Sequence, residues 1–573
     1  MTGHPSADGP AGDPLDAVAE VIARFGVDKR RLQLALALLT ERHQTLDSLV
    51  RGCALPRRTV ESLLRAADPD LDQNVSGAAI KAARAAAYRD RFGSGRPRRG
   101  QVADPYAALL AAHGDLVARM DADIVAAPAA RDALDHVAAT ADTVVRRALW
   151  LDSAFDLAGA RLLCIGDHDL SSLAACAVIP GLRVTVVDVD ERLLEFIDGR
   201  AAAYGYDIQC FYADFRYGLP DIVAGSADIV LTDPPYTPEG VELFLGRGAQ
   251  GIGDRANGRL VLAYGFSPLH PALGLKVQRA VQDLDLVAEA ILPAFNRYHG
   301  AQAVGSASDL YVLRPTARTF QILDKKLART AVNIYTHGAQ SLEGRSGALD
   351  PDTAGAVIAF ATGTEQGKPS LLVGERWPAA VGAATLDRAS LLASGLPASA
   401  VRLPRLEVAV DLADDPGPWL LRVLAAVSAD RLAVLVPNGH PDLATQETQR
   451  ALTALLAPKY ALRLRRSTPA SRYAIVEATA VEATAARSEP GAAPIARDFL
   501  CRAHGKIGNV WREALIRRSA RRPDGPLTKN EARALVAEAV SRPAWLEARL
   551  IDLPRLAIAA LLSEAEASVK AVS

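Results

Sequence analysis

Cysteine is scarce in this chain of 573 residues. The five cysteines are far apart in the sequence: Cys53, Cys164, Cys176, Cys210 and Cys501. They show neither the paired spacing of a zinc site nor the density of a disulfide-rich secreted domain. We therefore expect reduced thiols, mostly buried, and no metal.

Neither sign of charge is in excess, since 65 basic residues stand against 66 acidic ones. This balance argues against a surface built for non-specific nucleic-acid binding. Long apolar runs are missing as well, because charge interrupts each of them well before about 20 residues, so we expect no membrane span. Residues 1–14 are rich in Gly, Pro, Asp and Ala, which predicts a disordered tail rather than a leader. A cytoplasmic protein is expected.

Half of the residues are apolar, and the length predicts roughly three or four domains. The fold class is α/β. After the tail, the predicted parts are a winged-helix-like domain (15–104), a helical linker (105–150), a Rossmann-like S-adenosylmethionine-dependent transferase domain (151–316), a second, degenerate α/β domain without chemistry (317–488) and a helical C-terminal region (489–573).

The N-terminal part has the pattern of a helix-turn-helix. Thr45 can cap one short helix, Pro56 breaks it, and RRTVESLLRAA resumes as a second helix. Arg57 and Arg58 begin that helix, and the basic Gly/Pro loop of residues 89–100 follows where a wing would lie. These positions suit phosphate contacts, so a nucleic-acid partner is allowed. A dimerisation or lid domain with a solvated arginine face is an equal alternative, and a homodimer is allowed.

Strand and helix signals alternate through the central part. Strands are predicted over ARLLCIG, RVTVVDVD, IQCFYADF, ADIVLTDPPY and RLVLAYG, and LVAEAILPAF with SDLYVLRPT closes the sheet as a strand pair. Repeated strand–helix units imply a parallel sheet that binds ligands at the carboxyl ends of its strands.

The first strand is followed by Gly166, Asp167, His168 and Asp169. Gly166 makes a tight crossing that lets the backbone approach a cofactor. The three glycines of a dinucleotide fingerprint are missing, so NAD is not expected. Carboxylates at this place would repel phosphate and attract an amine. Asp169 or a serine capping the next helix is the alternative, and it accounts for one acidic residue but not for two.

The next two strands also end in carboxylates. Asp188 can accept hydrogen bonds from both hydroxyls of a ribose, whereas Asp190 is better placed to cap the following helix. Asp214 can accept from the amino group of an adenine while Phe215 packs on the ring. Three successive acidic strand ends indicate a nucleoside-binding site.

The sharpest motif is Asp233-Pro234-Pro235-Tyr236, at the end of the fourth strand. The prolines rigidify the loop against the cofactor and leave carbonyl groups without local donors. Asp233 can hold an amine through its proton while the lone pair faces an electrophilic carbon, and Tyr236 can shield the cationic centre. This arrangement serves alkyl transfer to nitrogen. A turn with an aspartate cap is the minority alternative.

Strand and helix signals return between residues 355 and 481. LEVAVDL, WLLRVLAAV, RLAVLVPNG, YALRLRR and SRYAIVEAT repeat the order of elements in the second half of the central domain. The segment is either a degenerate second copy or an unrelated α/β insertion, and its loop DLADDPGPW lacks the Asp-Pro-Pro-Tyr motif. In the last part, Thr528 and Glu531 predict a capping box.

In this order, the motifs GDHDL, VVDVDERLLEFI, ADFRYGLP, TDPPYTPEG and FLGRG resemble the branched-chain polyamine synthases, also called N(4)-bis(aminopropyl)spermidine synthases. The resemblance covers about residues 141–314 and, loosely, the N-terminal part. It implies an enzyme that moves aminopropyl groups from decarboxylated S-adenosylmethionine to an internal polyamine nitrogen and releases methylthioadenosine.

The resemblance also implies a role for each site residue. It places Gly166, Asp167 and Asp169 in the acidic catalytic loop, Asp188 on the ribose, Asp214 at the adenine and Asp233 beside the accepting amine. His168 is a departure, because the family has a third consecutive aspartate there. A neutral imidazole could serve as a base for the amine, whereas a protonated one would repel a polycation. An inert surface histidine is an equal alternative.

Two other functions stay open. The Asp-Pro-Pro-Tyr sequence is also similar to the amino-methyltransferases that modify exocyclic nitrogens of bases, with intact S-adenosylmethionine as cofactor and a nucleic acid or small amine as acceptor. A regulatory DNA-binding protein with a sensing sheet needs only the helix-turn-helix. Acidic pocket walls favour the decarboxylated cofactor, whereas an available arginine or a nest of backbone amides favours the intact one.

Overall fold

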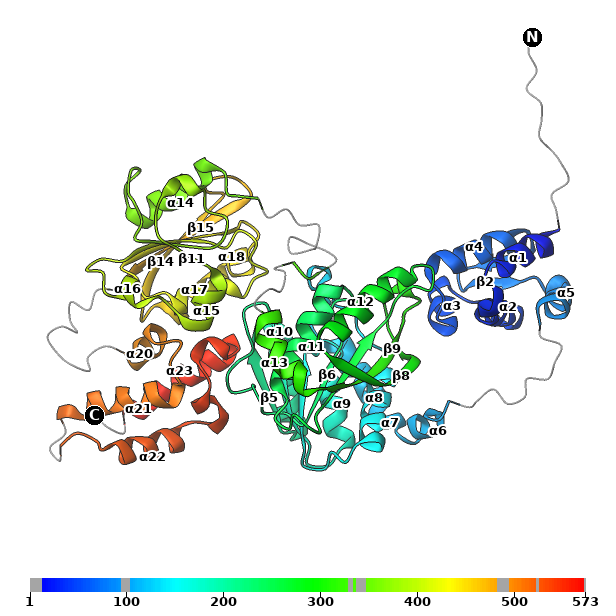
Figure 1. Ribbon diagram of the computed structural model, residues 1–573, viewed down its shortest axis with the longest axis horizontal. Coiled ribbons are helices and arrows are strands. Elements are labelled where there is room, and N and C mark those ends of the chain that lie inside the picture. The colour runs from blue at the N-terminus through cyan, green and yellow to red at the C-terminus, as the bar shows by residue number, and fades with distance from the viewer. Residues whose placement is uncertain are drawn as a thin grey trace, which may run out of the picture.

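The computed structural model describes residues 13–93, 104–327, 333–335, 347–481, 494–521 and 525–570. A helical N-terminal part, a central α/β part, a second α/β part and a set of C-terminal helices follow one another along the chain. Figure 1 shows the central part between the N-terminal helices and the second α/β part. None of the helices in the described residues is long and apolar enough to cross a membrane.

The N-terminal part consists of short helices and one β-hairpin. Thr45 caps α3 through the backbone N–H of Ser48, as predicted, and Ala54 then turns the chain in the left-handed region before α4. The elements are α1 (Pro14–Ala23), η1 (Gly26–Lys29), α2 (Arg30–Glu41), α3 (Leu46–Cys53), α4 (Arg57–Ala67), η2 (Asp68–Asp70), β1 (Leu71–Asn74), β2 (Gly77–Ile80) and α5 (Ala82–Phe92).

The hairpin corrects the predicted place of a wing. β1 and β2 pair antiparallel after α4, whereas residues 89–92, the start of the predicted loop, complete α5 because Phe92 packs into the core of this part. Residues 94–100 of that loop lie outside the described residues. The predicted tail is also too long, since Asp13 caps α1 and Pro14 is its first residue.

The start of α4 contacts the central part. Arg57 donates to Glu61 (2.8 Å) and to Gln302 of the central part (2.6 Å), and Gln302 donates to Asp47 of α3 (2.8 Å). In a DNA reader this end of the second helix enters the major groove. Here it binds protein, and the nucleic-acid partner stays a prediction.

The predicted helical linker is interrupted. It contains α6 (Ala107–Ala112), α7 (Gly114–Ala126), η3 (Asp132–Leu134) and α8 (Ala141–Ala154). Pro128 follows α7, and a proline disfavours the helical conformation of the residue before it. Residues 127–140 are therefore mostly irregular, and Ala139 pairs with Tyr298 of the central part.

The central part is a seven-stranded sheet in the order β5-β4-β3-β6-β7-β9-β8. The first five strands in this order are parallel, and the strand pair β8–β9 closes the sheet, as predicted. The structure adds that β9 pairs antiparallel with both β7 and β8. The elements are β3 (Arg161–Ile165), α9 (Ser171–Val178), β4 (Arg183–Asp188), α10 (Glu191–Tyr204), β5 (Ile208–Tyr212), β6 (Ile229–Thr232), α11 (Pro238–Gly251), β7 (Arg259–Tyr264), α12 (Pro271–Asp283), β8 (Leu286–Arg297), η4 (Gln302–Val304), β9 (Ala307–Pro315) and α13 (Ala317–Leu327).

Helices cover both faces of this sheet. Leu162 and Cys164 of β3 pack in one hydrophobic cluster with residues of α7 to α10, whereas Leu163 and Ile165 pack in another with residues of α11 to α13. Successive side chains of a strand point to opposite faces, so a strand buried on both sides is apolar throughout. This explains the unbroken apolar runs in the sequence.

The second α/β part is a six-stranded sheet in the order β11-β10-β12-β13-β15-β14. The central sheet has the same order once β5 is left out. In this correspondence β10 matches β3, and β12, which lies beside β10, matches β6. The elements are α14 (Pro351–Thr362), β10 (Leu371–Val373), η5 (Ala379–Val381), β11 (Thr385–Leu386), α15 (Arg388–Ser394), α16 (Ala398–Val401), β12 (Glu407–Asp411), α17 (Trp419–Ala426), β13 (Arg431–Pro437), α18 (Pro441–Ala444), α19 (Gln446–Leu456), β14 (Tyr460–Arg466) and β15 (Tyr473–Ala480).

The C-terminal helices lie against both α/β parts. Arg542 bonds to Asp198 of α10, and the backbone N–H of Arg555 donates to Glu191 (2.8 Å). One hydrophobic cluster runs from the central sheet through the second sheet into these helices. The predicted capping box of Thr528 and Glu531 is present. The elements are α20 (Ile495–Cys501), α21 (Ile507–Arg518), η6 (Ser519–Arg521), α22 (Lys529–Ala539), η7 (Pro543–Glu547), η8 (Leu550–Asp552) and α23 (Arg555–Val569).

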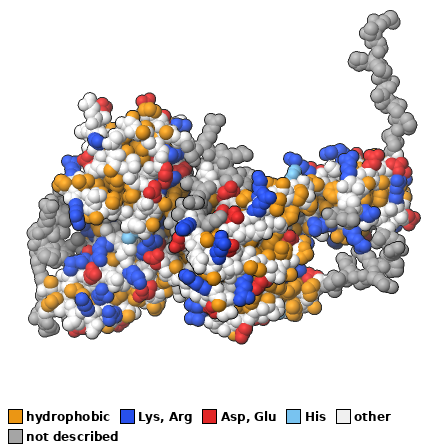
Figure 2. Space-filling view, viewed as in Figure 1, with side chains coloured by type: hydrophobic (Ala, Val, Ile, Leu, Met, Phe, Trp, Pro, Cys, Tyr) orange, Lys and Arg blue, Asp and Glu red, His pale blue; other side chains and the backbone are white. Residues whose placement is uncertain are grey.

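Surface charge is mixed in sign. Figure 2 shows basic and acidic side chains interspersed over the face in view, in keeping with a net charge of −1. The five cysteines are free thiols: Cys53, Cys164 and Cys210 are buried, Cys176 is half-buried and Cys501 is exposed.

Candidate active site

A cavity of about 570 Å³ opens at the carboxyl ends of β3 to β6. Its centre is where the strand order reverses between β3 and β6, the place at which open α/β sheets bind ligands. Every site residue predicted from the sequence lines it: Gly166, Asp167, His168, Asp169, Asp188, Asp214, Phe215, Asp233, Pro234, Pro235 and Tyr236. The sequence therefore located the cavity, and the role of each residue stays a prediction.

The loop after β3 bends sharply at Gly166, whose φ of +71° suits glycine. A Cβ there would also lie 3.4 Å from the ring of Phe244. The backbone N–H of Asp167 donates to Asp188 (3.2 Å), and the carboxylate of Asp167 accepts the N–H of Ser172 at the start of α9 (3.2 Å). The alternative that Asp169 or a serine caps this helix is wrong, because Asp167 takes that place.

Two carboxylates of the cavity accept hydrogen bonds from backbone N–H groups rather than from a cationic side chain. They are Asp167, which accepts from Ser172, and Asp188, which accepts from Asp167 and Asp190. Burial raises the pKa of Asp167 to about 8 and the pKa of Asp188 to about 6, and the hydrogen bonds that these groups accept only partly oppose this rise. This end of the cavity is suited to a cationic ligand. Asp190 caps α10, as predicted.

Arg147 of α8 joins the two acidic loops. Its guanidinium binds Asp169 after β3 and Asp233 after β6, the latter at 2.7 Å. The other N–H groups point to Asn296 (2.8 Å), Ser171 (3.2 Å) and Tyr298 (3.3 Å). A guanidinium has five N–H donors. All five therefore have a protein acceptor.

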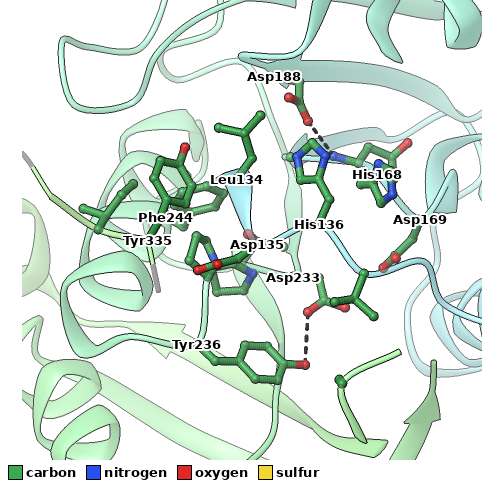
Figure 3. A pocket seen from close by; sticks show the side chains of 18 of the residues that line it. Leu134, Asp135, His136, His168, Asp169, Asp188, Asp233, Tyr236, Phe244 and Tyr335 are labelled. Carbon is green, nitrogen blue, oxygen red and sulfur yellow. Dashed lines mark hydrogen bonds between the residues drawn. The ribbon is translucent and has the colours of Figure 1, made fainter. Parts of the chain in front are cut away.

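Asp233 accepts hydrogen bonds on both oxygens. Oδ2 takes Arg147 and the hydroxyl of Tyr298 (2.7 Å), whereas Oδ1 lies 3.3 Å from the hydroxyl of Tyr236 (Figure 3). Oδ1 therefore keeps acceptor capacity toward the cavity. Burial and the charge of Asp169 raise the pKa of Asp233, and Arg147 opposes this rise. A carboxylate with a raised pKa can hold or take a proton near neutral pH.

His168 stacks on His136, a residue of the irregular stretch before α8. The ring centroids are 4.3 Å apart and the planes differ by 19°. Figure 3 shows the two labelled side chains close to one another. Burial lowers the pKa of both imidazoles, and that of His136 falls to about 3. The second largest cause of the low pKa of His136 is the neighbouring ring of His168. Both rings are therefore neutral at pH 7. The pair is half-buried and uncharged at pH 7, and the choice between a neutral base and an inert histidine stays a prediction for His168.

Asp214, which follows β5, lines the cavity on the side away from Asp233. It forms an ion pair with Arg216. Its oxygens accept from the backbone N–H (3.1 Å) and Nε (2.8 Å) of Arg216, from Arg216 Nη2, and from the indole of Trp419 (3.0 Å). A carboxylate has about four acceptor positions. The predicted bond to an adenine amino group would have to share one of them.

Sequence reasoning missed the residues that other elements contribute to the cavity. Leu134, Asp135, His136 and Val137 come from the stretch before α8, Arg147 from α8, Tyr298 from β8's end, and Tyr335 from beyond α13. Two features of the sequence could have pointed to these residues. Pro128 should have ended the predicted linker helix, and Arg147 stands among apolar residues in VVRRALW.

The central part is similar to known proteins. Residues 115–326 match the sequence family described as the branched-chain polyamine synthase A C-terminal domain. An uncharacterized protein of Methanocaldococcus jannaschii is 32% identical over 189 residues, 33% of this chain and 47% of that protein. The N(4)-bis(aminopropyl)spermidine synthase of Thermococcus kodakarensis is 39% identical over 117 residues, 20% of this chain and 33% of that enzyme.

The enzyme of the same name from M. jannaschii is 30% identical over 187 residues, 32% of this chain and 53% of that enzyme. The chain thus spans about half, or less, of the curated relatives it matches. Among solved structures, the Thermus thermophilus branched-chain polyamine synthase in complex with N4-aminopropylspermidine and 5'-methylthioadenosine shares 22% identity. Its TM-score is 0.38, over 53% of this chain and 92% of that one.

The sheet order and the cavity at its reversal point define the central part as a Rossmann-like α/β domain. Within this domain, residues 115–326 are similar to the C-terminal domain of the branched-chain polyamine synthases, and this match covers less than half of the chain.

We expect Arg147→Gln to lower the free energy of unfolding of the central part by about 3–5 kcal/mol, because it leaves Asp169 and Asp233 buried without a cation. Chemical denaturation measures this. Arg318→Gln is the control, since the Arg318–Asp285 pair (3.0 Å) is exposed and contributes roughly 0–1 kcal/mol. Equal losses in the two variants would contradict the bridging role of Arg147.

Proposed function

We propose that the chain transfers an aminopropyl group from decarboxylated S-adenosylmethionine to an amine nitrogen of a polyamine. The observation that carries this proposal is an acidic cavity whose lining arginine, Arg147, has no N–H group left for a ligand carboxylate. The match of residues 115–326 to the polyamine synthase family supports it.

The choice of donor follows from Arg147. Intact S-adenosylmethionine carries a carboxylate, which costs free energy to bury unless a cation or N–H donors receive it. Among the described residues that line the cavity, Arg147 is the cationic side chain, and Asp169 and Asp233 already neutralise it. The cavity therefore suits a donor without a carboxylate.

Asp167 would hold the cationic part of this donor, and Asp188, which accepts the backbone N–H of Asp167, would hold its ribose. When bound, the donor supplies a sulfonium-activated carbon that an amine nitrogen can attack, and neutral methylthioadenosine leaves. Among the described residues, neither carboxyl group has a cationic side chain as partner, so an approaching positive charge offsets the cost of ionising it while buried. Gly166 lets the backbone come close on this side.

Asp233 would receive the acceptor amine. Its Oδ1 is the oxygen with acceptor capacity left, and its raised pKa suits a group that takes the proton released as nitrogen forms the new bond. Tyr236 and Tyr298 fix the carboxylate by hydrogen bonds. The neutral pair of His136 and His168 gives the wall near Asp169 a less acidic face than three consecutive aspartates would.

The second α/β part would be a degenerate copy of the central domain without its own chemistry. Its sheet has the central strand order less one strand. Three carboxylates at the ends of its strands are bound by arginines: Arg376 pairs with Asp411 (2.6 Å), and Arg388 pairs with Glu375 (2.9 Å) and Asp414 (2.6 Å). Carboxylates held in this way are not free to bind a cationic donor.

The direct test compares the two donors. With spermidine and decarboxylated S-adenosylmethionine, the chain should release methylthioadenosine and give a product heavier by one or more aminopropyl groups, detected by mass spectrometry. With intact S-adenosylmethionine we expect at least about tenfold weaker binding, because its carboxylate finds no partner. Methyl transfer from the intact donor to an amine or a nucleic acid would replace this proposal with the methyltransferase alternative.

Donor affinity should rise with pH. In the free protein Asp167, with a pKa of about 8, is protonated and neutral below that pH. A bound cation favours the carboxylate, so binding releases a proton, and the dissociation constant of the decarboxylated donor should fall between pH 6 and 8, by at most about tenfold per unit. Calorimetry measures it. Methylthioadenosine, which lacks the sulfonium charge, is the control, and an equal pH slope for both ligands would contradict the role of Asp167.

Asp233→Asn keeps the shape of the side chain but cannot take a proton. We expect turnover to fall by about 10²–10⁴-fold. The dissociation constant of methylthioadenosine should change by less than about twofold, because Asp233 does not hold the nucleoside. Normal turnover in this variant would refute the amine role of Asp233.

A further inference from the structure

In the second α/β part, the loop that corresponds to the Asp233–Tyr236 loop packs behind a wall of the cavity. β12 occupies the place of β6 in its sheet, so residues 412–418 follow the equivalent strand. This loop ends at Trp419, the first residue of α17, which is 0% exposed. Trp419 does not line the cavity but packs directly behind it.

Trp419 contacts the ion pair of Asp214 and Arg216. This pair lies at the end of the cavity where the adenine is predicted to bind, which we call the base end. Its indole Nε1 donates to Asp214 (3.0 Å), and the guanidinium of Arg216 lies 5.1 Å from its ring centroid. Arg388, from its own part of the chain, lies 4.8 Å from the same centroid, and Tyr217 packs edge-on at 5.2 Å. The ring is thus held from both parts of the chain.

The indole supplies a hydrogen bond that the base end cannot make for itself. Of the four donors to Asp214, three belong to Arg216, two residues further along the same turn. Trp419 supplies the fourth, from 205 residues away in the sequence. It therefore fixes the Asp214 carboxylate against movement with its own loop. Phe215, which lies between the two paired residues, lines the cavity.

The same loop also holds a second wall of the cavity. Arg131 donates a hydrogen bond to the backbone carbonyl of Pro416. Arg131 directly precedes the stretch of residues 132–137, most of which line the cavity and which includes His136. The degenerate loop thus supports two separate walls from behind.

We propose that Trp419 is a positioning residue for the nucleoside of the donor, through which the second α/β part holds the base end of the cavity in its binding geometry. This inference rests on the proposed function, in which the base end receives the adenine of an adenosyl donor. It gives the second α/β part a role in the reaction of the central one.

Trp419→Phe is the principal test, because it keeps a ring beside Arg216 and removes the N–H. Without that donor the Asp214 carboxylate loses its fixed orientation, and binding must restore it. We expect the dissociation constant of methylthioadenosine to rise by about 3- to 10-fold, measured by calorimetry, and KM for the donor to rise in parallel. The turnover number at saturating donor and KM for spermidine should change by less than about twofold.

Trp377→Phe is the matched control. The indole of Trp377 is also nearly buried in the second α/β part and donates to the carbonyl of Val373 (2.8 Å), but Trp377 does not contact the central part's charged pair. The same chemical change there should leave methylthioadenosine binding unaltered. An equal loss in both variants would show a general loss of stability and overturn the inference.

Hydrogen exchange on the wild-type chain provides a test that does not depend on a variant folding. Because coupling between sites is reciprocal, methylthioadenosine should slow exchange of the backbone amides of Trp419 and Leu420, which bond to Asp415. Unchanged exchange with the ligand bound, or unchanged affinity in Trp419→Phe, overturns this inference alone. Failure of methylthioadenosine to bind the wild-type chain overturns the proposed function as well.

Discussion

The bridge that Arg147 makes between Asp169 and Asp233 is the constraint on which the site depends. Two buried carboxylates on neighbouring strand ends would repel one another without a cation between them. The guanidinium removes this repulsion, and its planar fork sets the distance and orientation of both loops. Because its remaining N–H groups are also satisfied, the bridge is a structural element of the cavity. Within the described residues, the carboxyl groups of Asp167 and Asp188 have no arginine partner and remain for a ligand.

Much of this arrangement could be predicted from the sequence, because a parallel sheet brings the ends of its strands to one edge. The acidic residues after β3, β4, β5 and β6 line one cavity for that reason. Arg147, His136 and Tyr298 could not be found in this way, since they enter from elements whose position depends on tertiary packing. The same applies to Phe92, whose burial extends α5 into a Gly/Pro-rich stretch. β10 and β11, with three and two residues, are too short to show any periodicity.

The two sheets show what a shared strand order does and does not determine. In both, carboxylates gather after the strands, since that edge carries the loops. In the central sheet one arginine serves two carboxylates and leaves others for a ligand. In the second sheet Arg376 and Arg388 occupy the carboxylates themselves. The positions of a few arginines therefore decide whether the acidic edge of such a sheet is an open cavity or a cluster of ion pairs. The order of the strands changes little between the two.

The hydrophobic cluster that continues from the central sheet into the second sheet and the C-terminal helices has a consequence for how the chain is divided. Borders drawn from composition near residues 316 and 488 separate segments that share one core. Severing the chain there would expose apolar side chains such as Leu420 and Trp511 to water. The described residues between 104 and 570 are thus better regarded as one folding unit, whose parts are recognisable by topology but share one core.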